Sequence, residues 1–203
     1  MGYFDRFSQG IYADKSKWQK IWHFIWKEDS LESWLINIAL AYVVIKFLIY
    51  PGLGFLLATS HPIVAVVSSS MHHNANLDTY WGYAGQWYEE KGITKESFRT
   101  FPMHNGFNKG DIMVLVGRDP NKIKVGDVIV FANPVRPEPI IHRVVATHES
   151  FFQTKGDHNT DSLPFEEQIL SQMIYGKAVF RIPLLGYVKI SAVNLLNLVR
   201  GGA

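Results

Sequence analysis

Four polar residues of the chain have the types and spacing needed for acyl-transfer chemistry. Ser70 follows an apolar run, His142 lies within another, and Asp157 and Asp161 belong to one turn-forming segment further along the chain. An imidazole with a pKa of about 6.5 is the natural proton acceptor for a serine hydroxyl near neutral pH. A carboxylate can hold that imidazole in the tautomer that the reaction needs. These residues therefore indicate a serine hydrolase.

The same residues also have ordinary structural interpretations. Ser68 and Ser70 share a face if the strand that begins at Ile63 runs as far as Ser70. Their hydroxyls then form a nucleophile with a helper donor, or they only cap a turn. A histidine among apolar neighbours, such as His142, is more often a hydrogen-bonded core residue than a base. The aspartates lie among Gly and Asn, which are the usual residues of turns.

Composition excludes several other kinds of chemistry. The chain of 203 residues has no cysteine, which rules out disulfides, thiol catalysis and cysteine-ligated metals. Its 20 basic and 18 acidic residues give a formal net charge of +2, which argues against nucleic acid as a partner. The 8 histidines show no metal-ligand spacing, and the sequence has neither a phosphate-binding loop nor a G-x-S-x-G motif. We therefore expect neither a metal nor a cofactor.

A long apolar segment, residues 34–59, precedes the candidate nucleophile. A bilayer core needs about 20 apolar residues, and the segment reaches that length if Lys46 and Pro51 are tolerated within it. The stem of a lysine can carry its ammonium group to the interface, and a proline bends a helix. We predict one membrane-spanning helix over 34–59 with a bend near Pro51, the alternative being a buried core helix. Asp29 and Glu32 have the spacing of a capping box at its start.

The segment before this span, residues 1–33, contains an amphipathic pattern. Its apolar residues recur with helical spacing and define one face: Trp18, Ile21, Trp22, Ile25 and Trp26. Such a helix lies in the lipid headgroup layer, or it packs on another protein. The same segment carries basic residues: Arg6, Lys15, Lys17, Lys20 and Lys27. By the positive-inside rule they place the N-terminus in the cytoplasm and the remainder of the chain outside the cell membrane.

Residues 60–190 change to short apolar runs separated by turn residues, which is typical of a β-domain. The expected strands are Ile63–Ser68, Ile112–Val116, Val128–Ala132, Ile140–Ala146, Phe151–Thr154 and Ala178–Ile182. An aromatic-rich block, residues 77–103, interrupts them and is interpreted as a partly helical insertion that caps the sheet. The C-terminal tail, residues 191–203, contains a candidate short helix at Ser191–Val199. The sequence thus predicts a mainly β fold behind an N-terminal transmembrane helix.

Five segments of the β-domain form an ordered set: Ser68–Met71, Lys109–Ile112, Val125–Phe131, Ile141–Val144 and Lys155–Asn159. Together they resemble the motifs of type I signal peptidases, in particular of the archaeal and endoplasmic-reticulum branch. The stretch Gly176–Gly186 resembles the closing strand of that family. The resemblance covers about residues 35–190. It is specific because several motifs match in the same order along the chain. It implies a signal-peptidase-like β-barrel or sheet domain and a membrane-bound serine endopeptidase that removes signal peptides from exported precursors through an acyl-enzyme.

The resemblance also implies a role for each matching position. Ser70 matches the nucleophile, His142 the general base, and Asp157 the acidic residue of the Gly-Asp motif. Ser68 matches a position whose hydroxyl assists the backbone amide of Ser70 in the oxyanion hole. Members of this branch often carry a second aspartate about six residues after the first, where this chain has leucine. Asp161 therefore stays open beside Asp157 as the acid that orients His142.

Two other functions are compatible with the sequence. A membrane-tethered β-domain without catalytic activity would bind a protein partner, and its serine cluster would be incidental. The same fold could instead cleave other substrates, such as pilin-like precursors or the protein itself. The sequence does not identify accessory subunits.

Overall fold

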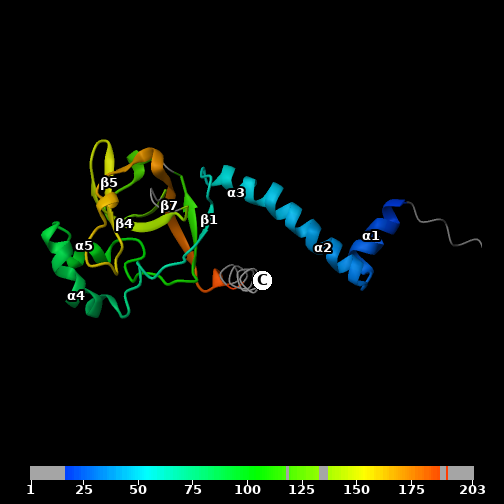
Figure 1. The fold of residues 1–203 in the computed structure, drawn as a ribbon, viewed down its shortest axis with the longest axis horizontal. Helices are drawn as coiled ribbons and strands as arrows, with labels where there is room; N and C mark the ends of the chain where they lie inside the picture. Colours follow the sequence, from blue (N-terminus) through cyan, green and yellow to red (C-terminus); the bar gives the residue numbers. More distant parts are fainter. Residues whose placement is uncertain (1–16, 118, 133–136, 188–190, 192–203) are drawn as a thin grey trace, which may run out of the picture. The chain divides into compact units, whose positions relative to one another are not determined.

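The computed structural model of the chain describes residues 17–117, 119–132, 137–187 and 191 (Figure 1). The chain forms two compact units, residues 1–52 and residues 53–203. Apart from Ser191, the expected C-terminal tail and its candidate helix lie outside the described residues, as do Arg6 and Lys15.

The first unit is helical, with α1 (Lys17–Lys27) followed by α2 (Leu31–Val44). Ser30 rather than Asp29 caps α2, because its side chain accepts a hydrogen bond from the backbone N–H of Ser33 at 3.2 Å. A serine oxygen at this position satisfies one of the N–H groups that have no partner within the helix.

Two side chains of α2 hold the end of α1. The hydroxyl of Ser33 donates to the carbonyl of Phe24 at 2.6 Å, and the amide of Asn37 donates to the carbonyl of Ile25 at 2.8 Å. Carbonyls near the end of a helix lack partners within it, so these bonds tie α1 to the first turns of α2. Large side chains of the predicted face remain exposed: Trp18, Ile21, Trp22 and Trp26.

α2 continues through a π-helical turn, η1 (Ile45–Ile49), into α3 (Tyr50–Leu56). The whole helix has 26 residues and a mean hydropathy of 1.9 over its apolar window, so it is long and apolar enough to cross a membrane. The π-helical turn falls directly before Pro51, whose ring collides with the carbonyl four residues earlier in a regular helix. There the N–H of Tyr50 reaches back five residues to the carbonyl of Ile45.

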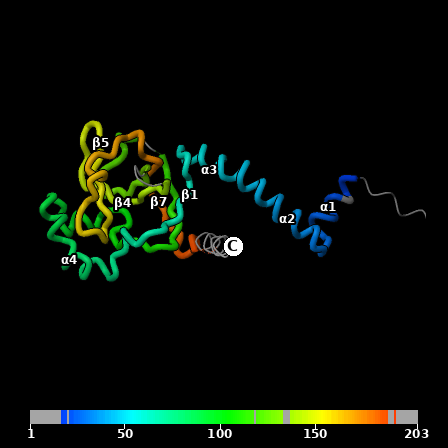
Figure 2. Tube along the Cα trace, in the orientation of Figure 1, coloured from blue at the N-terminus to red at the C-terminus, as the bar shows by residue number. Residues whose placement is uncertain are grey.

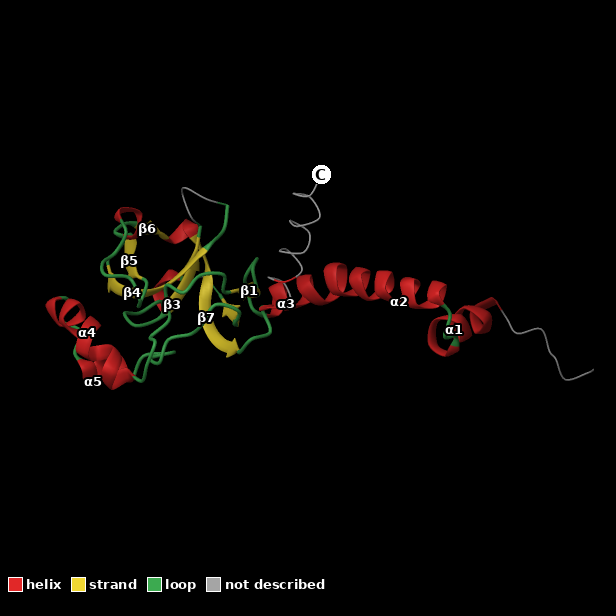
Figure 3. Cartoon of the chain, turned by 60° about the horizontal axis from the view of Figure 1, so that its bottom comes forward, coloured by secondary structure: helices red, strands yellow, loops and turns green. Residues whose placement is uncertain are grey.

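The second unit is built on a seven-stranded antiparallel sheet with the order β1-β2-β7-β3-β4-β5-β6, drawn in yellow in Figure 3. The strands are β1 (Ile63–Ala65), β2 (Ile112–Val116), β3 (Val128–Phe131), β4 (Ile140–Thr147), β5 (Phe151–Lys155), β6 (Ile169–Leu170) and β7 (Ile174–Ile182). The predicted mainly β fold is confirmed. β6 and the first half of β7 were not predicted, because β6 is only two residues long and a glycine and a lysine interrupt the apolar run in β7.

β1 is shorter than the sequence predicts. After Ala65, Val66 still exchanges backbone hydrogen bonds with Asp111 and Gly110, both at 2.9 Å, and the chain then leaves the sheet. A turn follows, in which the N–H of His72 bonds to the carbonyl of Ser69 at 3.0 Å. The nucleophile candidate is therefore carried by a loop at the edge of the sheet and not by a strand.

The insertion forms two helices, α4 (Leu77–Glu90) and α5 (Lys95–Arg99), which begin at the N-cap residues Asn76 and Thr94. Its helical character is as predicted. Its apolar side packs against Val145 of β4. Figure 2 traces α4 in green at the lower left of the second unit. The buried members of this cluster are Leu77, Tyr80, Trp81, Tyr88, Ile93, Phe98 and Val145. Because the insertion covers one face of β4, residues 141–145 are buried on both faces of the strand.

Candidate active site

Ser70 is held by its loop rather than by a strand. Its hydroxyl lies 3.0 Å from that of Ser68, so the two side chains meet as expected, although the geometry of a strand is not the reason. The backbone N–H of His158 donates to the carbonyl of Ser70 at 2.8 Å. The next side chain, Met71, is buried in the core, and its carbonyl accepts the N–H of Phe107 at 3.0 Å. The loop is therefore fixed on both sides of the serine.

His142 lies in β4, opposite Ile129 of β3, and the residue is buried, with 4% of its surface exposed. His142 and both serines line one cavity of about 750 Å³ at the edge of the sheet. The remaining lining residues are Val64, Ala65, Val67, Glu138, Pro139, Ile140, Ile141, Asn159, Leu163 and Phe165. The structure thus brings Ser68, Ser70 and His142 together.

Gly156 shows how closely the serine and the histidine approach each other. A Cβ placed on this glycine would stand 2.7 Å from Nδ2 of Asn159, 2.8 Å from Nε2 of His142 and 2.9 Å from the carbonyl oxygen of Ser70. Real Cβ atoms essentially never come within 3.0 Å of a heavy atom outside their own neighbours. Nε2 of His142 and the backbone of Ser70 therefore flank the same small space, which only a glycine leaves open.

Gly156→Ala is consequently expected to impair the site. The added methyl group is too close to the amide of Asn159, the imidazole of His142 and the backbone of Ser70, so these groups must shift. A misplacement of about 1 Å can lower turnover by about 10²-fold. We expect that loss in kcat, measured on a peptide ester substrate, with a nearly unchanged melting temperature. Gly82→Ala is the matched control, because its Cβ would meet nothing within 4 Å. Full activity of Gly156→Ala would contradict the proximity of the two groups.

Lys155 supports the turn that carries this glycine. Its ammonium group donates to the carbonyls of Gly156 at 3.1 Å and Asp157 at 3.4 Å. It also lies over the rings of Trp87 and Tyr88, at 5.0 and 4.9 Å from their centroids. Burial lowers the pKa of Lys155 to about 8.

The carboxylate at His142 is one that the sequence did not suggest. Nδ1 of His142 is hydrogen-bonded to Oε1 of Glu166, which is fully buried at the end of a short 3₁₀ turn, η3 (Pro164–Glu166). The same oxygen accepts the hydroxyl of Thr154 at 2.8 Å, and Oε2 accepts the N–H of Leu163 at 2.9 Å. One signal in the sequence could have identified it. A glutamate three residues after the first residue of a proline-containing turn can accept a hydrogen bond from the backbone N–H of that first residue.

Asp157 occupies a different buried network. Its two oxygens accept hydrogen bonds from Nε and Nη2 of Arg143 at 2.9 and 2.8 Å. Nε2 of His73 lies 2.8 Å from Oδ2, and the hydroxyl of Tyr88 donates to Oδ1 at 3.0 Å. Burial raises the pKa of Asp157, but the charge of Arg143 and the hydrogen bonds outweigh it and hold the pKa well below its usual value.

Asp161 is exposed and accepts the indole N–H of Trp87 at 2.8 Å, a bond that lowers the pKa of its carboxyl group. Over the described ranges, no hydrogen bond or ion pair joins His142 to Asp157 or to Asp161. The structure brings neither of the expected acids to the histidine.

The low pKa of Asp157 predicts how stability changes in acid. Because the folded-state value lies below the ordinary value of 3.8, the network stabilises the fold fully above that pH and loses this contribution as the pH falls below it. We expect the melting temperature to fall steeply below pH 4 and the slope to be smaller in Asp157→Asn. Glu149→Gln, at an exposed carboxylate in the turn between β4 and β5, serves as the control and should keep the wild-type slope.

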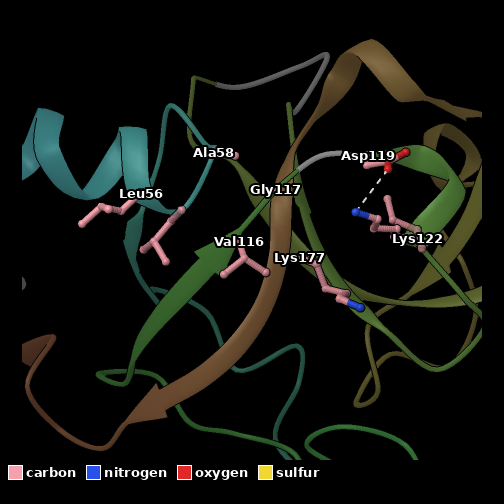
Figure 4. Close-up of a pocket in the computed structure, with 9 residues that line it drawn as sticks. Leu56, Ala58, Val116, Gly117, Asp119, Lys122 and Lys177 are labelled. Carbon is pink, nitrogen blue, oxygen red and sulfur yellow. Dashed lines mark ion pairs between the residues drawn. The ribbon is translucent and has the colours of Figure 1, made fainter.

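A second cavity of about 520 Å³ lies away from these residues, near the end of α3 (Figure 4). Its lining includes Leu56, Ala58, Val116 and Gly117, together with an ion pair between Asp119 and Lys122 at 3.7 Å. The ammonium of Lys177, which also lines it, pairs with Asp127 at 3.3 Å. None of its described lining residues is a nucleophile with an adjacent base, so the cavity of Ser70 is the candidate active site.

Several known proteins are similar in sequence to this chain. No family model matches the chain. It is 30% identical over 164 residues to the signal peptidase complex catalytic subunit SEC11 of Scheffersomyces stipitis, a match that covers 75% of this chain and 79% of that protein. The protein of the same name from Komagataella phaffii is 27% identical, with 77% and 80% covered. That from Debaryomyces hansenii is 36% identical over 99 residues, with 43% and 59% covered.

The cavity of the antiparallel sheet brings together a serine and a buried histidine, and a buried carboxylate is hydrogen-bonded to that histidine. A helix apolar enough to span a membrane precedes the sheet in the sequence. These features define a serine hydrolase with a candidate membrane anchor. The chain belongs to the family of signal peptidase complex catalytic subunits named SEC11. The resemblance to type I signal peptidases that the sequence motifs show is thereby confirmed.

Proposed function

We propose that this chain is a membrane-bound serine endopeptidase that removes N-terminal signal peptides from exported precursor proteins. The observation that carries the proposal is the placement of Ser70 and His142 in one cavity, on either side of the space above Gly156. Membership in the SEC11 family supports the same activity.

The reaction follows from the atoms in this cavity. Oγ of Ser70 attacks the carbonyl carbon of the scissile bond, while Nε2 of His142 takes the hydroxyl proton and passes it to the leaving amine. The acyl-enzyme is then hydrolysed by a water that His142 activates. The backbone N–H of Ser70 and the hydroxyl of Ser68 are the proposed oxyanion donors, and one such donor contributes about 2.7–4 kcal/mol.

The edge of the sheet supports a mode of substrate binding. β1 is the first strand in the sheet order, so its outer edge has no strand partner among the described residues, and Val64 and Ala65 of β1 line the cavity. A precursor bound in extended form along this edge points its last and third-last signal-peptide residues to the same face. Ile140 and Phe165 occupy the wall of the cavity and favour small side chains there, as in an A-x-A cleavage site.

The apolar helix supports a membrane location for the enzyme. We propose a single-pass protein of the cell membrane, with the N-terminal segment in the cytoplasm and the catalytic unit on the outer side, where cleavage sites emerge. α1, tied to the start of α2, is proposed to lie in the headgroup layer with its tryptophans toward the lipid. The names of the relatives place them in a signal peptidase complex, and we propose that this chain also works with further subunits.

Cleavage of a model precursor tests the proposed function. The full chain, purified in detergent, is incubated with a precursor that has alanine at the last and third-last positions of its signal peptide. We expect one cut after the last alanine, identified by mass spectrometry of the new N-terminus. A matched precursor with leucine at the last position should remain intact. Cleavage of both precursors to the same extent, or of neither, would argue against a signal peptidase.

A further inference from the structure

We propose that Glu166, and neither aspartate of the preceding turn, is the carboxylate that orients His142 for catalysis. This inference rests on the proposed function, in which His142 is the base. Glu166 touches no substrate in this scheme and is a positioning residue that acts through the imidazole.

The hydrogen bonds of Glu166 favour one tautomer of His142. Oε1 of Glu166 accepts bonds from Nδ1 of His142 and from the hydroxyl of Thr154, and Oε2 accepts the N–H of Leu163. An acceptor at Nδ1 requires the proton of a neutral imidazole to be on that nitrogen. Nε2 is then unprotonated and faces the space shared with Ser70, which is the form that can accept the hydroxyl proton.

Hydrogen bonds to neighbouring segments hold Glu166 in place. Its carboxylate closes its own 3₁₀ turn through Leu163, and its backbone N–H bonds to the carbonyl of Leu163 at 2.8 Å. The side chain is fully buried, and Thr154 of β5 holds it from the other side. Leu163 and Phe165 of the same segment line the cavity, so a single turn supplies both the carboxylate and part of the cavity wall.

The two aspartates are already engaged elsewhere. Asp157 receives four hydrogen bonds from Arg143, His73 and Tyr88, all on the side of β4 that the insertion covers. Asp161 is exposed and bonded to Trp87. Moving either carboxylate to Nδ1 of His142 would break these bonds and would require the displacement of Glu166.

Glu166→Gln is the test, because it keeps the shape and removes the charge. In the glutamine side chain the NH₂ group must face either the N–H of Leu163 or Nδ1 of His142, and both of these groups are donors in the wild type. The imidazole can relieve the conflict only by moving its proton to Nε2. We expect kcat for precursor cleavage to fall by about 10³–10⁴-fold with little change in KM, as for a triad whose orienting acid is lost. Glu167→Gln, at the exposed neighbour, should be unaffected.

Two further measurements separate positioning from folding and from the proposed function. In wild-type protein labelled with ¹⁵N-histidine, the resonances of His142 should show a proton on Nδ1 and a nuclear Overhauser contact to the side chain of Glu166. In Glu166→Gln the proton should move to Nε2. These signals require no substrate, so they test Glu166 even if the precursor is not cleaved. Absence of the contact in the wild type would overturn the inference. A wild-type kcat in Glu166→Gln would also overturn it. The same holds if Asp161→Asn loses about 10³–10⁴-fold in kcat while Glu166→Gln stays active.

Discussion

Ser70→Ala should abolish precursor cleavage. Loss of the nucleophile in a serine enzyme that uses a histidine base lowers turnover by about 10⁶-fold, because water attacking directly has neither the position nor the activation of the hydroxyl. His142→Ala should cause a loss of the same order. The double variant should be no worse than either single variant, since the two groups act in one step.

The measurement is single-turnover cleavage of the model precursor in detergent, with labelling of the serine by a fluorophosphonate as a second readout. Ser69→Ala is the matched control, because Ser69 is exposed and lies outside the cavity of Ser70. It should keep both cleavage and labelling. Undiminished processing by purified His142→Ala would eliminate the proposed base. Undiminished processing by Ser70→Ala would eliminate the proposed nucleophile. Absence of both cleavage and labelling in the wild type would leave the non-catalytic β-domain as the better interpretation of the serine cluster.

Arg143→Met is expected to give the largest loss of stability, with the free energy of unfolding lower by about 3–5 kcal/mol. The guanidinium is fully buried and bonds to both oxygens of Asp157 and to the carbonyls of Pro102, Met103 and Gly126. Removing it leaves a buried carboxylate and several carbonyls without their partner, which is more costly than losing the attraction of one ion pair.

Thermal unfolding of the full chain, followed by near-ultraviolet circular dichroism, measures this loss. Arg99→Met is the matched control, since Arg99 also pairs with an aspartate but is 60% exposed and solvent screens the pair. Its melting temperature should change little. Arg143→Met combined with Asp157→Leu should recover part of the stability, because the unpaired charge is then removed as well. Equal effects of the two arginine substitutions would show that burial of the network contributes little.

Some of the fold was predictable because its signals are local. Runs such as Ile112–Val116 and Val128–Phe131 combine apolar and β-branched residues between turn residues, and both are strands. The helical spacing of the tryptophans near the N-terminus predicted α1. β6 has only two residues, and its pairing with β5 through Phe151 and Phe152 depends on the sheet rather than on its own sequence.

The sequence by itself determined the family and the mainly β architecture that follows an apolar helix in the chain. It also identified a serine and a histidine that line one cavity. Only the tertiary structure decided which carboxylate serves the histidine. His142 and Arg143 are neighbours in β4, so their side chains point to opposite faces of the sheet. Asp157 lies on the face of β4 that carries Arg143, whose buried guanidinium binds it. On the opposite face, His142 is hydrogen-bonded to Glu166, which belongs to a turn later in the chain. Spacing along a chain identifies which acids are near in sequence, but the face on which each one is buried depends on contacts between segments that are distant in sequence.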